Sequence, residues 1–152
     1  MTPTLHTARL VLRPRRAADR APFAALNANP AVMAPLPTPL TRVESDALAD
    51  RIAAHLADYG YGLWAVEVGW RLAHAHGRCG YATEAARAAV AYGFDEVGLD
   101  EIVSFTVPHN RPSRRVREKV GLLFAGEFEH PRLPAGHPLR RHMHYRLIAA
   151  QR

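Results

Sequence analysis

The stretch GRCGYATEA, residues 77–85, places two glycines directly before a helical pattern. Gly77 and Gly80 bracket Arg78 and Cys79, and glycine is favoured where another group must come close to the backbone. The first amides of a helix lack partners within the helix and lie at the positive end of its dipole, so they bind anions, above all phosphate. This stretch therefore predicts a phosphate-binding turn. The alternative is that the glycines only shape a tight turn.

The sequence lacks the two common nucleotide-binding glycine motifs. It contains neither GxxxxGKS nor GxxxxGKT, which argues against a P-loop, and it contains no GxGxxG, which argues against a dinucleotide site of the Rossmann type. A phosphate ligand of another kind is expected.

Other reactive side chains give weaker patterns. The thiol of Cys79 at a helix start could act as a nucleophile, but no accompanying His and Asn or Asp pattern supports this, and a small loop side chain is the favoured interpretation. His74 with His76, and His142 with His144, could each face one side of a strand as metal ligands. Without cysteine or carboxylate partners at set spacing, we interpret them as ordinary surface histidines and expect no metal.

Composition limits the class of protein. The 152 residues are 48% hydrophobic, which suits a single domain over 1–152 with a buried core. No apolar run is long enough for a membrane span, no secretory signal is recognisable, and the lone cysteine fits a reducing compartment, so we expect a cytoplasmic protein. The net charge of +6 favours acidic or phosphate-bearing partners. Nucleic acid is not expected, because no zinc-finger spacing or RNA-binding signature accompanies the arginines, which are densest at Arg111, Arg114, Arg115 and Arg117.

Hydrophobic periodicity and turn residues predict an ordered series of elements. Thr41 and Glu44 form a capping-box pattern for a helix over 42–58, whose buried stripe is expected to include Val43, Ile52 and Leu56. The prolines of residues 29–40 predict a loop without regular structure. The full expectation is strands at 5–14, 62–73, 101–107, 126–130 and 142–148, with helices at 19–26, 42–58, 82–97 and from Asn110 to Gly121. This order indicates an α/β or α+β fold, with helices packed on a sheet.

Several motifs in this order resemble the GNAT family of N-acetyltransferases, in the branch similar to the ribosomal-protein N-terminal acetyltransferases. The motifs are RLVLRP, EVGWRL, GYATEAARAAVAYGF and SFTVPHNRPSRRVREKVGL, and together they cover nearly the whole chain. The resemblance implies a mixed, mostly antiparallel central sheet flanked by helices. It also implies an acetyl-CoA-dependent transfer of an acetyl group to a primary amine, either a protein N-terminus or a small molecule.

The chain departs from the family pattern in two places. The Gln or Arg that normally opens the acetyl-CoA loop falls on Gly77. In addition, GLWAVE is normally separated from EVGWRL by a hairpin, whereas here the two segments are fused through Glu67. Either a central hairpin is missing from the fold or the sequence omits a segment. A lost interior strand would leave ladder groups unpaired unless a neighbour supplied them.

The resemblance also implies roles for individual residues. Glu67 would act as the general base that takes a proton from the amine, the alternative being a solvent-exposed carboxylate at the edge of a strand. Asn110 and Ser113 would contact the cofactor arm, although Asn110 could also simply cap its helix. The remaining contacts to acetyl-CoA would come from the backbone, with the pantetheine paired near Trp70, Arg71 and Leu72 and the pyrophosphate held by the amides of Arg78, Cys79, Gly80, Tyr81 and Ala82.

Two other functions compete with the enzymatic one. A degenerate relative could bind acyl-CoA or a protein partner without catalysis, and a basic domain could bind nucleic acid. The expected partners are acetyl-CoA and an amine acceptor, and a homodimer is left open.

Overall fold

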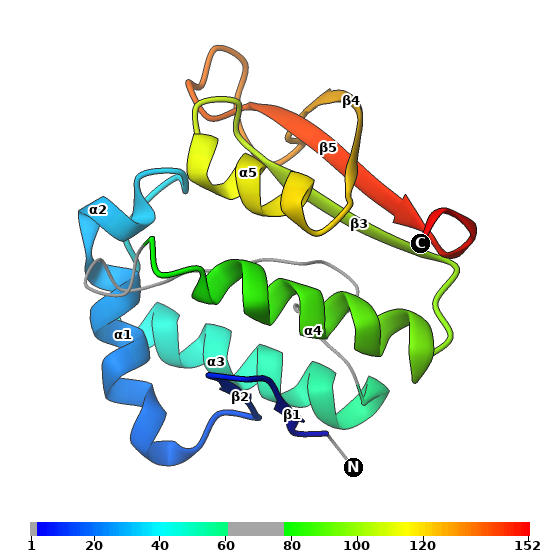
Figure 1. Cartoon of the computed structure of the whole chain (residues 1–152). Coiled ribbons are helices and arrows are strands. Elements are labelled where there is room, and N and C mark those ends of the chain that lie inside the picture. Colours follow the sequence, from blue (N-terminus) through cyan, green and yellow to red (C-terminus); the bar gives the residue numbers. More distant parts are fainter. Residues whose placement is uncertain (1–2, 61–77) are drawn as a thin grey trace.

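The computed structural model describes residues 3–60 and 78–152. Helices and strands are mixed, as the sequence predicts, and Figure 1 shows them in chain order. The strands are β1 (Leu5–His6), β2 (Val11–Leu12), β3 (Glu101–Thr106), β4 (Leu123–Glu129) and β5 (Arg141–Ile148). The α-helices are α1 (Arg20–Ala28), α2 (Pro30–Met33), α3 (Arg42–Tyr59), α4 (Tyr81–Asp95) and α5 (Arg111–Lys119), and short 3-10 helices occupy Ala17–Asp19 and Ala149–Gln151. Within the described ranges, no helix is long and apolar enough to cross a membrane.

The described strands form two antiparallel sheets. In the larger sheet β5 lies between β3 and β4, and Ser104 of β3 faces Tyr145 of β5. β4 begins three residues before the predicted 126–130 strand, and its register shifts between Phe124 and Gly126. The antiparallel character expected from the resemblance is confirmed. The strand predicted at 62–73 lies outside the described residues.

The strand predicted over 5–14 is wrong in one respect, because the chain turns back within it. β1 and β2 pair as a short hairpin, with Leu5 opposite Leu12. The amide of Thr7 donates to the carbonyl of Leu10 at 3.0 Å, and the amide of Leu10 donates to the hydroxyl of Thr7, also at 3.0 Å. A threonine hydroxyl that bonds the backbone nearby favours a turn without needing Gly or Pro.

The loop predicted over 29–40 also contains a short helix, α2. Asn29 caps it by accepting a hydrogen bond from the amide of Ala31 at 2.9 Å, and Pro30 occupies the first helical position. Proline is well tolerated there, because that amide would have no helical partner in any case. The prolines therefore shape this segment without excluding a helical turn.

Helix α3 starts and ends where the sequence predicts. The hydroxyl of Thr41 accepts from the amide of Glu44, the carboxylate of Glu44 accepts from the amide of Thr41, and Gly60 ends the helix in the left-handed conformation. The predicted buried stripe is only partly right. Ile52 and Leu56 are buried, but Val43 is 77% exposed. The buried face of α3 is formed instead by Ser45, Ala49, Ile52 and Leu56.

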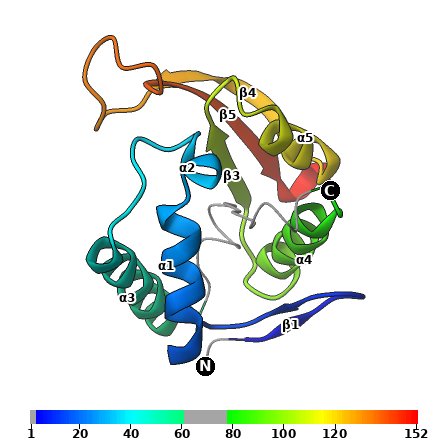
Figure 2. The same ribbon diagram turned by 90° about the vertical axis from the view of Figure 1, so that its left-hand side faces the viewer.

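The main core lies between the larger sheet and helices α4 and α5. Ile102 and Tyr145 from the sheet are 0% and 2% exposed, and they pack with Ala86 and Val90 of α4. Figure 2 shows α4 and α5 on one side and α1 and α3 on the other, with β3 between them. Helices α4 and α5 thus pack against the same sheet.

Shortening Ile102 should test this core directly. Ile102→Ala removes fully buried methyl groups, and we expect it to lower the free energy of unfolding by about 2–5 kcal/mol, whereas Ile102→Val should cost only about 1 kcal/mol. Urea denaturation of both variants measures the difference. Equal stabilities of the Ala variant and the wild type would contradict the assignment of Ile102 to the core.

Candidate functional site

The turn before α4 has the unusual backbone that its glycine suggests. Arg78 has φ 63° and Gly80, the N-cap of α4, has φ 81°. No side chain caps this helix start among the described residues, and the helical hydrogen bonds begin with the amide of Glu84 donating to the carbonyl of Gly80 at 3.0 Å. The amides of residues 81–83 therefore have no acceptor within the helix. Gly80 is required by the turn, and the turn presents amides suited to an anion.

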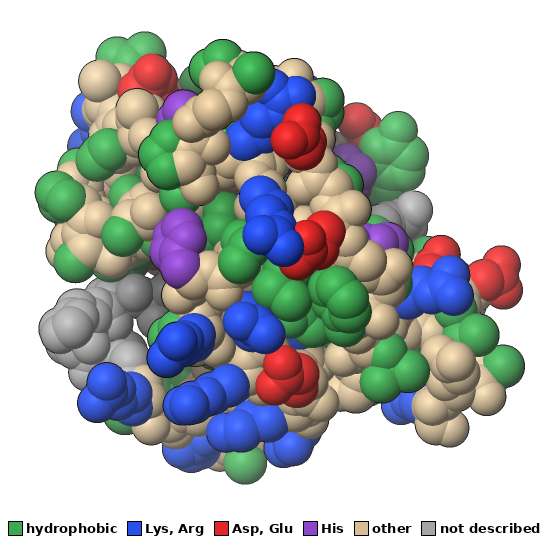
Figure 3. Space-filling model, turned by 90° about the horizontal axis from the view of Figure 1, so that it is seen from above, with side chains coloured by type: hydrophobic (Ala, Val, Ile, Leu, Met, Phe, Trp, Pro, Cys, Tyr) green, Lys and Arg blue, Asp and Glu red, His purple; other side chains and the backbone are tan. Residues whose placement is uncertain are grey.

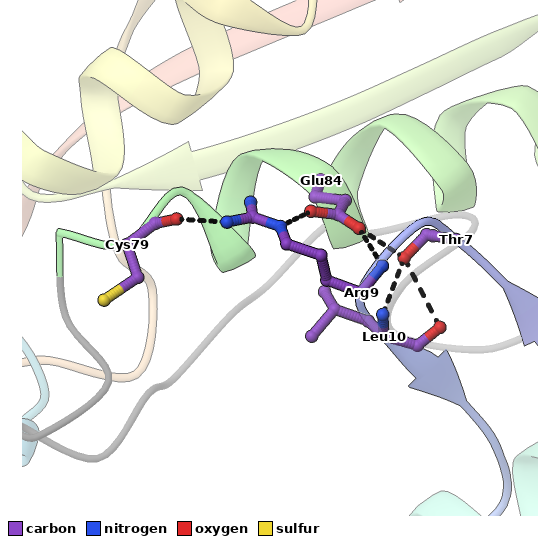
Figure 4. A network of polar contacts seen from close by, with 5 residues as sticks. All are labelled: Thr7, Arg9, Leu10, Cys79 and Glu84. Atoms are coloured by element: carbon purple, nitrogen blue, oxygen red, sulfur yellow. Dashed lines mark hydrogen bonds and ion pairs between the residues drawn. The ribbon is translucent and has the colours of Figure 1, made fainter.

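The N-terminal hairpin contacts this turn through Arg9 (Figure 4). The Nε atom of Arg9 lies 2.7 Å from a carboxylate oxygen of Glu84, and its Nη1 donates to the carbonyl of Cys79 at 3.0 Å. Its guanidinium carbon lies 4.8 Å from the ring centroid of Tyr81. One arginine thus touches the residue before the N-cap, the first helical residue and the first-turn carboxylate.

Glu84 receives hydrogen bonds from two further groups of the hairpin. The hydroxyl of Thr7 donates to Glu84 at 2.6 Å, and the backbone amide of Arg9 donates to it at 2.8 Å. These bonds, that of Thr7 first and then that of the Arg9 side chain, lower the pKa of Glu84 below its ordinary value. A carboxylate in the first turn also complements the helix dipole. Glu84 is therefore ionised at neutral pH.

Sequence reasoning missed Thr7, Arg9 and Glu84. Thr7 and Arg9 lie 77 and 75 residues before Glu84 in the chain, so no local spacing connects them with it. The only local sign is an acidic residue in the first turn of a helix that has a glycine N-cap.

A shallow open depression lies beside the turn, with a volume of about 690 Å³. The hairpin, α4 and the end of α5 contribute to it, and its basic residues are Arg9, Arg87 and Lys119. The other lining residues are Thr7, Gly80, Thr83, Glu84 and Ala88. This surface can accommodate a ligand with negative charge.

The start of α5 contains the other two described residues assigned to cofactor binding. The side chain of Asn110 accepts a hydrogen bond from the amide of Ser113 at 3.4 Å, so its capping role is confirmed. Ser113 is in turn bound by Arg117, whose Nη1 donates to the carbonyl of Ser113 at 3.0 Å and also to its hydroxyl. Figure 1 shows that α4 and α5 lie side by side and begin on the same side of the molecule. Asn110 and Ser113 thus stand at the same end of the helix pair as the turn.

Two members of the arginine group on α5 serve the fold. Arg117 is 3% exposed, and it donates to the hydroxyl of Ser104 at 2.9 Å and to the carbonyl of Phe105 at 2.6 Å. Arg114 donates to the hydroxyl of Tyr145 at 3.2 Å. Half of the cluster expected to favour phosphate partners is therefore used inside the protein.

Basic side chains nevertheless remain on the surface. Figure 3 shows the face seen from above relative to Figure 1, where Lys and Arg side chains gather at the lower left with few acidic side chains among them. Such a surface attracts anions in general through its electrostatic potential.

The interpretation of His142 as a surface histidine is wrong. His142 is 9% exposed and packs against the rings of Phe105, Phe128 and His130. Burial lowers its pKa, so the ring is held neutral. His144 is partly buried, and His74 and His76 lie outside the described residues. Among the described residues, no group of three or more potential ligands could hold a metal ion.

The structure does not describe the segment assigned to the pantetheine and to catalysis. Glu67, Trp70, Arg71 and Leu72 all lie outside the described residues, as does Gly77. Their roles stay predictions.

The family follows from a comparison with known protein families. The family model described as acetyltransferase (GNAT) domain matches residues 9–68 and 64–123. The chain belongs to the GNAT acetyltransferase family. The two matched segments meet at residues 64–68, which is where the sequence fuses GLWAVE to EVGWRL.

Individual GNAT proteins are similar to this chain at the levels of sequence and fold. The uncharacterized N-acetyltransferase YnaD of Bacillus subtilis is 38% identical over 81 residues, which are 53% of this chain and 48% of YnaD. The aligned region thus spans about half the length of that curated relative. A GNAT-family acetyltransferase from Bacillus anthracis has a TM-score of 0.80 at 24% identity, covering 95% of this chain and 98% of that one. RimJ of Mycobacterium smegmatis, solved in complex with CoA-disulfide, has a TM-score of 0.73 at 20% identity, covering 92% and 82%.

Replacing Gly80 should reveal the strain in the turn. Gly80 has φ +81°, and an added Cβ there would lie 3.3 Å from Nη2 of Arg9. Gly60 has φ +73°, and an added Cβ there would have no atom of the described residues within 4 Å. Gly60→Ala is therefore the matched control, and its left-handed backbone should cost about 1 kcal/mol. We expect Gly80→Ala to cost more, because Arg9 must also move. Chemical denaturation compares the two, and an unchanged stability of Gly80→Ala would rule out the left-handed turn.

The lowered pKa of Glu84 gives a dependence of stability on pH. The folded-state pKa lies below the ordinary value of 4.5, so Glu84 stabilises the fold above that value and loses this effect as pH falls through the folded-state pKa. We expect the free energy of unfolding of the wild type to fall more steeply with acidification below 4.5 than that of Glu84→Gln. Glu118→Gln, which alters an exposed carboxylate on α5, should keep the wild-type slope. Identical slopes for all three proteins would contradict the role given to Glu84.

Proposed function

We propose that the chain is an acetyl-CoA-dependent N-acetyltransferase that transfers the acetyl group directly to a primary amine. The observation that carries the proposal is the turn at Arg78 and Gly80 in a chain of the GNAT family, where no side chain of the described residues caps the first amides of α4. Those amides suit the diphosphate of acetyl-CoA, because a helix N-terminus favours a phosphate group. The complex of RimJ with CoA-disulfide supports the choice of ligand.

Among the described residues, the starts of α4 and α5 would bind different parts of acetyl-CoA. The amides of residues 78–82 would hold the diphosphate, with Gly80 allowing its close approach. Asn110 and Ser113 would face the cofactor arm from the start of α5, where Arg117 fixes Ser113. The pantetheine would pair with the backbone of Trp70, Arg71 and Leu72.

Transfer would proceed by direct attack on the thioester. A neutral amine has the lone pair that the reaction needs, and Glu67 would remove its extra proton, through water where the distance requires it. The amine nitrogen would then bond to the thioester carbon and the carbon–sulfur bond would break. The nitrogen would release one proton as the amide forms, and the CoA thiolate would take up one proton. A backbone amide near Leu72 would stabilise the charge that develops on the thioester oxygen.

The proposed acceptor is a primary amine, either a protein N-terminus or a small molecule. Arg140 ends the loop between β4 and β5, and Arg141 begins β5. Arg140 pairs with Glu129 at 2.8 Å, and Arg141 pairs with Glu127 at 2.6 Å. Their charges are therefore largely offset, and an acidic acceptor gains little support from them.

A second candidate is an acyl-CoA-binding protein without catalytic activity. It is favoured by the division of the family match into two segments, which overlap at residues 64–68 and so include Glu67. In this alternative the diphosphate turn still binds acyl-CoA, but no acetyl group is transferred.

Calorimetric titration with acetyl-CoA, followed by an assay of CoA release with a panel of primary amines, separates the two candidates. We expect saturable binding of acetyl-CoA and release of CoA only when an amine is present, since attack is direct. Binding without release for any amine would favour the non-catalytic candidate, and the absence of binding would overturn both.

Intact-mass spectrometry after incubation with acetyl-CoA alone tests for a covalent intermediate. No acetyl adduct is expected on the protein, and an adduct at Cys79 would contradict direct attack.

A further inference from the structure

The guanidinium of Arg9 spans the whole turn at the start of α4. It reaches the carbonyl of Cys79 at 3.0 Å, the ring of Tyr81 at 4.8 Å and the carboxylate of Glu84 at 2.7 Å. Arg9 comes from the N-terminal hairpin, which Figure 2 shows extending beneath α4. A distant segment of the chain therefore fixes the conformation of this turn.

The bond from Arg9 to Cys79 sets the direction of an amide. The carbonyl of Cys79 and the amide of Gly80 belong to one planar trans peptide, in which the C=O and N–H point in opposite directions. By holding the carbonyl at 3.0 Å, Arg9 directs the Gly80 amide away from itself. Arg78, at φ 63°, is in a conformation that is costly for a residue with a side chain, so the turn needs such an external contact to persist.

The pair of Arg9 with Glu84 also controls the charge at this site. The carboxylate of Glu84 lies in the first turn of α4, close to the amides that would hold the diphosphate. An unpaired negative charge there would repel an anionic ligand. With Arg9 at 2.7 Å, the charge is offset while the carboxylate still anchors the hairpin through Thr7.

From these two observations we propose that Arg9 is a positioning residue for the diphosphate of acetyl-CoA. It orients the peptide between Cys79 and Gly80, and it offsets the charge of Glu84. This inference rests on the proposed function, because it assigns the same turn to the cofactor diphosphate.

A purely structural role of Arg9 makes a different prediction. If Arg9 only attached the hairpin to α4, its loss would weaken the binding of every ligand to the same extent. If Arg9 prepares the diphosphate site, its loss affects only ligands that carry the diphosphate. S-acetylpantetheine has the thioester and the pantetheine but no diphosphate, so it separates the two roles.

The test measures the affinities of acetyl-CoA and of S-acetylpantetheine for the wild type, Arg9→Ala and the double variant Arg9→Ala with Glu84→Gln. We expect Arg9→Ala to weaken acetyl-CoA about tenfold and to leave S-acetylpantetheine within about twofold. The double variant should regain part of the loss, because the repelling carboxylate is gone. The KM for acetyl-CoA should rise while kcat at saturation stays near that of the wild type.

Two further variants keep the test decisive. Arg42→Ala breaks an exposed pair with Asp46 on α3, and it should leave both affinities unchanged. Arg9→Lys keeps the charge but lacks the planar fork that reaches Glu84 and Cys79 together, so about a threefold loss for acetyl-CoA alone is expected. If Arg9→Ala fails to fold, the affinities of Arg9→Lys for the two ligands decide between the two roles of Arg9.

Equal weakening of both ligands, or no weakening of acetyl-CoA in either Arg9 variant, would overturn the role of Arg9 while leaving the proposed function intact. If the wild type bound no acetyl-CoA, the proposed function itself would fall, and the inference with it.

Discussion

The contact of Arg9 with Glu84 joins two parts of the chain that lie 75 residues apart. It is partly exposed, and exposed ion pairs stabilise a fold only weakly. Its importance lies in geometry, because the same guanidinium also holds the carbonyl of Cys79. Hairpin, turn and helix start are thereby fixed relative to one another, and the directions of the amides before α4 follow from that arrangement.

A second arginine has a similar role in the interior. Burying a guanidinium is costly unless its donors are satisfied, and Arg117 meets this condition by bonding Ser104 and the carbonyl of Phe105 on β3 and the backbone of Ser113 on α5. It therefore ties the end of a strand to the first turn of the following helix. The two helix starts assigned to the cofactor are each braced by an arginine, one at the surface and one in the core. The positive charge of the chain serves its architecture as well as any ligand.

Local signals in the sequence were enough to predict α1, α3, α4 and α5, but not the short helix α2 or the long-range contacts. The capping box of Thr41 and Glu44 fixed the start of α3 correctly because both partners lie within four residues. The hairpin within 5–14 was missed because its turn depends on the hydroxyl of Thr7 and contains neither glycine nor proline. In the site, Gly80 and the Asn110 cap could be identified locally. Arg9 could not be identified in this way, because no residue near it in the sequence indicates that Glu84 is its partner.

The two segments of the family match overlap at residues 64–68, between the N-terminal hairpin and the proposed diphosphate turn. Both helix starts that would hold the cofactor, with their bracing residues on β3 and α5, lie after this point in the chain, and Arg9 comes from the segment before it. The contacts of Arg9 with Cys79 and Glu84, and those of Arg117 with Ser104 and Ser113, join described residues directly. The proton acceptor, by contrast, is assigned to Glu67 within residues 64–68. Diphosphate binding and proton removal are therefore assigned to different parts of this chain, and a change near Glu67 would abolish turnover while the diphosphate turn keeps its geometry.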